Sequence, residues 1–224
     1  MTSVPDRVRW AIDVLAPRRG ERLLDIGSGT GASVELLCEA VSTDAAGRPP
    51  IVAIDRSAAA VERIRERVAG TAASGAVEVV LTPLAGLDPS LGPFDAAIGV
   101  NVNVFWTSAA LPELRALAGA VRPGGRLLVA YGIGPVPLAD AGHLDGVEAA
   151  IRATPWFRVR ERLEAEHGSG VLAERTEVAE DIGRAGGAFA RSRPPEPAIS
   201  SRGAYDRMSR VANRHAASPP NTAT

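Results

Sequence analysis

Apolar residues gather in short runs that alternate with amphipathic stretches along the first three quarters of the chain. The runs have the composition of buried strands and occupy residues 22–26, 51–55, 77–81, 94–101 and 126–131. Beside them, apolar residues recur every three or four positions, the period of a helix with one buried face. These stretches are residues 4–16, 32–41, 58–69, 109–121 and 138–153. Such alternation predicts a doubly wound α/β fold with a mainly parallel sheet.

Two further apolar runs close the patterned region. Residues 157–166 and 170–178 are predicted to be strands joined by the turn-forming residues between them. A hairpin of this kind adds an antiparallel strand at one edge of a parallel sheet. The pattern fades after residue 179, and proline-rich segments follow. We therefore expect a domain over residues 1–179 and a mostly disordered tail over residues 180–224.

A glycine-rich turn joins the first predicted strand to a predicted helix. It reads Leu23-Leu24-Asp25-Ile26-Gly27-Ser28-Gly29-Thr30-Gly31. Glycine has no Cβ atom, so a ligand can approach the backbone of such a turn. The amide groups of the first helical turn then face a polar or anionic ligand group. Asp25 stands at the carboxyl end of the strand, where open α/β sheets bind their ligands.

The composition narrows the range of partners. The 224 residues include 25 basic and 26 acidic side chains, and every basic residue is an arginine. A formal net charge of -1 favours neither nucleic acid nor an anionic membrane as a partner. The lack of lysine excludes a Schiff-base mechanism. The single cysteine, Cys38, excludes a cysteine zinc cluster, and no metal site is expected.

Targeting signals and long apolar segments are not visible in the sequence. No stretch approaches the roughly 20 apolar residues of a membrane-spanning helix, and the first residues lack the apolar core of a signal peptide. We therefore expect a cytoplasmic protein with no membrane partner. The expected partner is a small-molecule substrate, and a homodimer is left open.

Four segments, in order, resemble one known family. The chain is similar to the class I S-adenosylmethionine-dependent methyltransferases of the small-molecule type over about residues 5–178. Residues 24–31 resemble the family's first motif, and Asp55 resembles the acid that ends its second strand. Residues 94–97 and 122–127 resemble its later motifs, the second through the turn Arg-Pro-Gly-Gly. The resemblance implies a Rossmann-like sheet of seven strands with an antiparallel last strand.

The resemblance also implies how S-adenosyl-L-methionine would be bound as the cofactor. The glycine turn would line its methionine part, and Asp25 would hold its amino group. Asp55 would accept both ribose hydroxyls, because a carboxylate has two oxygens. Arg56 would flank the adenine, and Asn101 would border the methionine end. The expected cofactor-binding residues are Asp25, Gly27, Ser28, Gly29, Asp55, Arg56, Leu84 and Asn101.

One position departs from the family pattern. The family usually has an acid after strand three that binds the adenine amino group, and Pro83 stands there in this chain. Leu84, which follows, offers only backbone groups, so adenine recognition is expected to rest on main-chain contacts. The departure leaves a non-catalytic S-adenosylmethionine-binding protein as an alternative function.

The predicted function is an S-adenosylmethionine-dependent methyltransferase, a transferase that methylates a small molecule by in-line displacement. Such a reaction needs little from the protein beyond alignment of donor and acceptor. An acceptor of high pKa needs a general base. The catalytic candidates for this role are His143, which follows the predicted strand of residues 126–131, and Tyr131, which ends that strand. An NAD(P)-dependent oxidoreductase is a less favoured alternative. It is considered because Gly27, Gly29 and Ala32 also fit a looser dinucleotide pattern.

Overall fold

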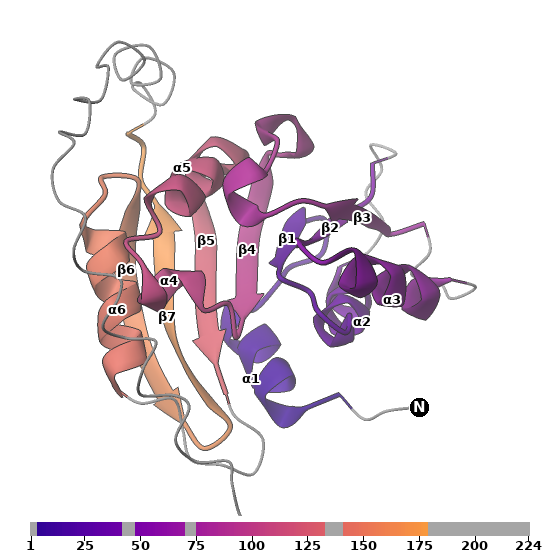
Figure 1. Ribbon diagram of the computed structural model, residues 1–224, viewed down its shortest axis with the longest axis horizontal. Coiled ribbons are helices and arrows are strands. Elements are labelled where there is room, and N and C mark those ends of the chain that lie inside the picture. The colour runs from indigo at the N-terminus through magenta and orange to yellow at the C-terminus, as the bar shows by residue number, and fades with distance from the viewer. Residues whose placement is uncertain (1–3, 42–47, 70–74, 133–140, 179–224) are drawn as a thin grey trace, which may run out of the picture. The chain divides into compact units, whose positions relative to one another are not determined.

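The structure of the protein, a computed structural model, describes residues 4–41, 48–69, 75–132 and 141–178. Its elements, shown in Figure 1, are α1 (Asp6–Leu15), β1 (Leu23–Ile26), α2 (Ala32–Ala40), β2 (Ile51–Asp55), α3 (Ala58–Val68), β3 (Val77–Leu81), the 3₁₀ helices η1 (Leu84–Gly86) and η2 (Pro89–Leu91), β4 (Phe94–Val100), α4 (Val104–Thr107), α5 (Leu111–Ala120), β5 (Val121–Tyr131), α6 (Ala141–Arg152), β6 (Phe157–Ala165) and β7 (Gly168–Arg175). The expected tail lies outside the described residues, so the domain boundary stays a prediction.

Seven strands form one sheet in the order β3-β2-β1-β4-β5-β7-β6, as Figure 1 shows. The first five in this order are parallel, and β7 runs antiparallel to both β5 and β6. All four residues of β1 are buried, as expected for a strand covered on both faces. The predicted fold class is therefore confirmed, including the reversed strand, which lies between β5 and β6.

Neighbouring residues of β1 point into two different cores. Leu24 and Ile26 pack in a cluster with α5 and α6, whereas Leu23 packs in a cluster with α1, α2 and α3. The helices thus cover the sheet from both sides. Because β1, β2 and β4 are parallel, their carboxyl ends lie at the same edge of the sheet, between the two helical layers. Ligands bind at this edge in open α/β folds.

The turn expected at residues 122–125 lies inside strand β5, so this expectation is wrong. Phe94 pairs with Val121 and Ala96 pairs with Arg126, and the residues between them bulge out of the ladder. Gly124 takes a left-handed conformation there, with φ at +74°. Pairing resumes on both sides of the bulge, and the turn is therefore absorbed into one long strand.

Short helices follow β3 and β4 where the sequence suggests only loops. η1 and η2 lie between β3 and β4, and three residues separate the end of β4 from the start of α4. Asn101, just after β4, has φ at +60°, a left-handed conformation that asparagine tolerates better than most residues. Helices of three or four residues are too short to show a hydrophobic period, so no pattern in the sequence predicts them.

Strand β6 lies at one outer edge of the sheet and is covered with charged side chains. Arg158 and Arg160 contact Glu174 of β7, at 3.5 and 2.7 Å. Arg162 contacts Asp145 of α6. Charged side chains on an edge strand discourage pairing with other chains.

Arg175 ties the end of β7 to the rest of the domain. Its side chain is 2% exposed, and burial lowers its pKa. Its Nε donates to the carbonyl oxygen of Ala118 in α5 at 3.0 Å, and Nη1 donates to the carbonyl of Val178 at 3.2 Å. The described chain therefore ends in a buried, hydrogen-bonded anchor.

We expect a chain that ends after Val178 to melt cooperatively, close to the full chain, because it keeps every described element and this anchor. A chain that ends after Glu174 should lose roughly 1–3 kcal/mol of unfolding free energy, since the carbonyl of Ala118 loses its buried donor. Melting curves by circular dichroism measure both. Loss of the cooperative transition after the cut at Val178 would show that later residues belong to the fold.

Candidate active site

The glycine turn after β1 lies against the end of β2. The backbone N–H of Gly27 donates to the carbonyl oxygen of Ile54 at 2.8 Å, and the N–H of Gly29 donates to Oδ2 of Asp55 at 3.0 Å. Gly27, Gly29 and Gly31 have φ values of +63°, +55° and +75°. A side chain at any of them would be strained, so the glycines are required by the shape of the turn.

Asp25 lies beneath this turn and is 1% exposed. Ser33, in the first turn of α2, donates from Oγ to Oδ2 of Asp25 at 2.6 Å. Burial raises the pKa of Asp25 from 3.8 to about 6, and the nearby carboxylate of Asp55 adds to this increase. No described cation forms an ion pair with Asp25, so its negative charge is uncompensated within the described chain.

Asp55 ends β2 and is fixed by two backbone groups. Besides the bond from Gly29, its Oδ1 accepts a hydrogen bond from the N–H of Ser57 at 2.9 Å. Ser57 in turn caps α3 by accepting from the N–H of Ala60 at 3.4 Å. Both oxygens of Asp55 are thus held in place, and each keeps a further lone pair for a ligand.

A large cavity opens beside Asp55 at the carboxyl edge of the sheet. Its volume is about 460 Å³, within the usual range of ligand sites, roughly 300–1,000 Å³. The ends of β1 and β2, the loop after β3, α4 and the first turn of α5 form its walls. Arg56 and Leu84, two of the expected cofactor-binding residues, line it together with Pro83 and Glu113.

A smaller, polar cavity of about 150 Å³ lies on the other side of the glycine turn. Asp25, Ser28 and Gly29 line it, along with Arg7 of α1 and Ser33 of α2. Gly27 and Asn101 line both cavities. The structure therefore brings all eight expected cofactor-binding residues to two adjoining cavities, while their roles in binding stay predictions.

Asn101 also has a structural role at this edge. Its side-chain Nδ2 donates to the carbonyl oxygen of Gly132 at 3.1 Å, and its Oδ1 accepts from the N–H of Gly132 at 3.1 Å. This pair of bonds joins the ends of β4 and β5. The side-chain amide is thus already used, and the residue borders the cavities mainly by its position.

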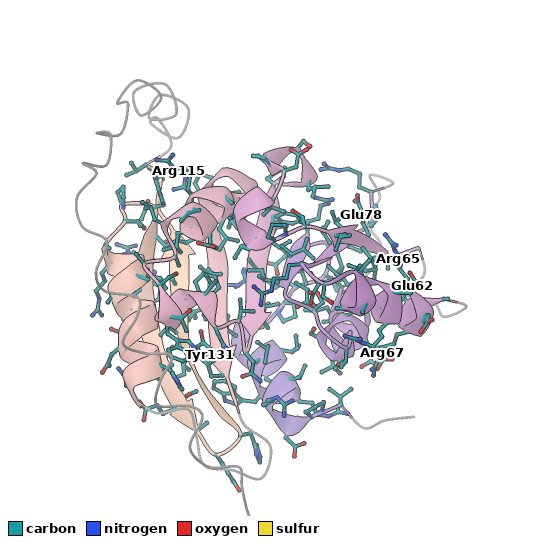
Figure 2. All side chains as sticks on the ribbon, viewed as in Figure 1. Glu62, Arg65, Arg67, Glu78, Arg115 and Tyr131 are labelled. Atoms are coloured by element: carbon teal, nitrogen blue, oxygen red, sulfur yellow. The ribbon has the colours of Figure 1, made fainter. Side chains whose placement is uncertain are left out.

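The two catalytic candidates, Tyr131 and His143, lie together in a separate cluster. Tyr131 is at the end of β5 (Figure 2), and its ring centroid is 6.0 Å from that of His143. His143 also packs on Trp106 of α4, with ring centroids 4.0 Å apart. Neither candidate is among the residues that line the two cavities. Their catalytic roles stay predictions.

Tyr131 supports the cavity wall through a hydrogen bond. Its hydroxyl donates to the carbonyl oxygen of Val102 at 2.9 Å, and burial raises its pKa. Val102 lines the larger cavity. A hydroxyl that is protonated at neutral pH and already donates its hydrogen is a poor general base, so the geometry gives Tyr131 a positioning role.

Several cavity residues escaped the sequence analysis, among them Arg7, Ser33 and Glu113. Ser33 lies eight positions after Asp25, and the other two lie on helices far from the glycine turn in sequence. Only the packing of those helices brings them to the site. Within the described residues, no group of three or more histidine, cysteine, aspartate or glutamate side chains could hold a metal ion, and no helix is long and apolar enough to cross a membrane.

Fold and site together define a class of protein. The strand order, the reversed β7 and the acids at the ends of β1 and β2 are those of a class I S-adenosylmethionine-dependent methyltransferase. Residues 23–125 match the family model described as a methyltransferase domain. This match spans just under half of the chain and includes the glycine turn, Asp25 and Asp55. The chain is thus similar to the S-adenosylmethionine-dependent methyltransferases, and S-adenosylmethionine is the cofactor that this similarity supports.

Several known methyltransferases are similar to the chain in sequence or structure. The chain is 31% identical over 164 residues to a protein-L-isoaspartate O-methyltransferase of Aeropyrum pernix, covering 73% of this chain and 55% of the relative. It is 33% identical over 130 residues to a demethylmenaquinone methyltransferase of Clavibacter sepedonicus, covering 58% and 49%. A solved S-adenosylmethionine-dependent O-methyltransferase from Thermotoga maritima has a TM-score of 0.58 at 16% identity, covering 77% of this chain and 65% of that chain. The chain thus spans about half the length of the curated relatives that it matches.

The site fits the cofactor in charge and shape. The buried carboxylate of Asp25 faces a small polar cavity, which suits an ammonium group. Asp55 presents two fixed carboxylate oxygens to a larger cavity, which suits a vicinal diol. At Gly27 an added Cβ would lie 3.1 Å from a methyl group of Val102, so a side chain at this position would crowd the lining of the larger cavity.

We expect Asp25→Asn to stabilise the ligand-free protein above about pH 6. The pKa of Asp25 is raised in the folded state, so its ionisation costs stability as pH rises from about 3.8 to about 6. Above that window the variant should gain on the order of 1–3 kcal/mol of unfolding free energy, and below pH 4 the gain should vanish. Denaturant titrations of the wild type and the variant, below pH 4 and above about pH 6, measure this difference in unfolding free energy.

The matched control is Asp13→Asn, which changes an exposed acid of α1. This control should change stability little at either pH. A gain by Asp25→Asn that is equal at both pH values would contradict ionisation of Asp25 as its cause.

Proposed function

We propose that the protein transfers the methyl group of S-adenosylmethionine to a small-molecule acceptor. The observation that carries the proposal is the convergence of the glycine turn, Asp25 and Asp55 on two cavities with a shared border at Gly27 and Asn101. S-adenosylmethionine supplies a methyl group bound to a positively charged sulfur. In this proposal the protein contributes binding and alignment.

The residues around the turn would bind different parts of the cofactor. Asp25 would hold the ammonium group from below, and Ser33 fixes the orientation of that carboxylate. Asp55 would hold the ribose hydroxyls while it anchors the turn through Gly29. His143 remains the candidate base for an acceptor that must lose a proton, because Tyr131 has a raised pKa and is engaged with Val102.

Charge supports a small acceptor over a nucleic acid. Nucleic-acid binding draws on clusters of unpaired basic residues, but many arginines of the described chain contact acids. Arg160 and Arg162 contact Glu174 and Asp145, and Arg126 contacts Glu21. The names of the two curated relatives point to a protein and to a quinone precursor as acceptors. The quinone precursor is of the class proposed here.

Labelled methyl transfer tests the function directly. The full chain is incubated with S-adenosylmethionine labelled in its methyl group and with small-molecule, RNA and protein fractions of a cell extract. Label in the small-molecule fraction supports the proposal, whereas label in RNA or protein contradicts the acceptor class. Tight binding without transfer to any fraction would favour the alternative of a non-catalytic binding protein.

Asp55→Ala is expected to weaken binding of S-adenosylhomocysteine by more than roughly tenfold, because it removes the acceptor of the ribose hydroxyls and the anchor of Gly29. Isothermal titration calorimetry measures the change, and a melting curve shows whether the variant is folded. Asp13→Ala, on the exposed face of α1, is the control and should bind as the wild type does. Unchanged affinity of the Asp55 variant would refute the role of that acid.

Glu113 is a candidate for the role of the acid that is usual at the position of Pro83. It lies in the first turn of α5, which packs against η1, and it lines the same cavity as Pro83 and Leu84. Within the described chain it has no hydrogen bond or ion pair. We infer that its carboxylate accepts a hydrogen bond from the adenine amino group, in place of the acid usual in the family.

A change of base preference tests this role. The wild type should bind S-adenosylhomocysteine at least roughly tenfold more tightly than S-inosylhomocysteine, whose ring has a carbonyl in place of the amino group. Glu113→Gln should narrow this ratio, because its amide can donate to the carbonyl. Glu62→Gln, at an exposed position of α3, is the control. An unchanged ratio in Glu113→Gln would exclude contact with that edge of the ring.

A further inference from the structure

The smaller cavity contains two opposite charges that do not pair with each other. Asp25 and Arg7 of α1 both line it. Arg7 forms no ion pair or hydrogen bond with any residue in the described ranges, unlike Arg67, which contacts Glu35 at 2.8 Å. A cation and an anion that line one small cavity without contact leave room for a ligand that carries both charges.

The side chain of Arg7 is positioned by packing against Gly132. An added Cβ at Gly132 would lie 2.6 Å from Cβ and 3.1 Å from Cδ of Arg7. The aliphatic stem of the arginine therefore lies directly on the backbone of Gly132. Asn101 holds that backbone on both sides, through the N–H and the carbonyl. The stem is thus fixed at the end of β5 while the residue borders the cavity.

The start of α2 adds positive character to the same cavity. Thr30, Ala32 and Ser33 line it, and the N-cap Gly31 provides no side-chain acceptor for the first amides of this nine-residue helix. Such amides, together with the helix dipole, favour an anionic group. Arg7 and the start of α2 are therefore positive, and Asp25 is the negative group.

The geometry points to Arg7 as the residue that binds the carboxylate of the cofactor's amino-acid end, while Asp25 binds its ammonium group. This inference rests on the proposed function and extends it to a residue outside the family motifs quoted above. A guanidinium is suited to the task because its planar fork can donate two parallel hydrogen bonds to one carboxylate. The cavity would then select ligands with an intact zwitterionic amino acid.

Two ligands that differ only at this end provide the test. S-adenosylhomocysteine carries the zwitterionic amino acid, and 5′-methylthioadenosine lacks it. Calorimetry on the full chain should show that Arg7→Leu lowers affinity for S-adenosylhomocysteine by roughly tenfold or more and leaves affinity for 5′-methylthioadenosine within about twofold. Arg7→Lys should retain part of the affinity, since it keeps the charge and loses the fork.

Arg9→Leu, at an exposed position of the same helix, is the matched control and should change neither affinity. An equal loss for both ligands in Arg7→Leu would overturn the proposal and give Arg7 a role in packing α1. No loss for either ligand would place the carboxylate elsewhere.

A second measurement on the wild type does not depend on a folded variant. The α-carboxamide of S-adenosylhomocysteine keeps the ammonium group and removes the negative charge, so the wild type should bind it roughly tenfold or more less tightly. Equal affinity for acid and amide would overturn the role of Arg7. Failure of the wild type to bind either adenosyl ligand would instead overturn the proposed function, and this inference with it.

Discussion

The hydrogen bond between the N–H of Gly29 and the carboxylate of Asp55 joins the two halves of the site. β1 and β2 are parallel neighbours in the sheet. The 3.0 Å contact, together with the bond from Gly27 to Ile54, holds the turn over the end of β2. Asp25 is buried under the turn as a result, and a cavity opens on each side of it. Left-handed glycines are needed because only they follow this path without strain.

The sheet and half of the site could be predicted because both depend on local patterns. Buried strands have continuous apolar runs, and parallel strands bring residues at their carboxyl ends, such as Asp25 and Asp55, to one edge. Arg7 and Glu113 could not be found this way, because their positions depend on how α1 and α5 pack onto the sheet. The expected turn at residues 122–125 is wrong because the glycines there indicate a break in the strand. Only the pairing with β4 shows that the strand continues past them.

Asp25 illustrates how a binding site opposes stability. A carboxylate buried without a described cation is costly when ionised, which is why burial raises its pKa. Ser33 offsets part of this cost through one short hydrogen bond. In the proposed function, binding of an ammonium group would offset more of this cost, and the ligand would then stabilise the folded domain.

The charged outer strand β6 constrains how copies of this protein could associate. Arg158, Arg160 and Arg162 already contact acids of β7 and α6. Adding a strand from a second copy alongside β6 would remove water from these side chains and disturb their contacts, at a cost that backbone pairing alone would have to recover. Continuation of the sheet across a subunit boundary is therefore disfavoured at this edge, and self-association would have to use a different surface.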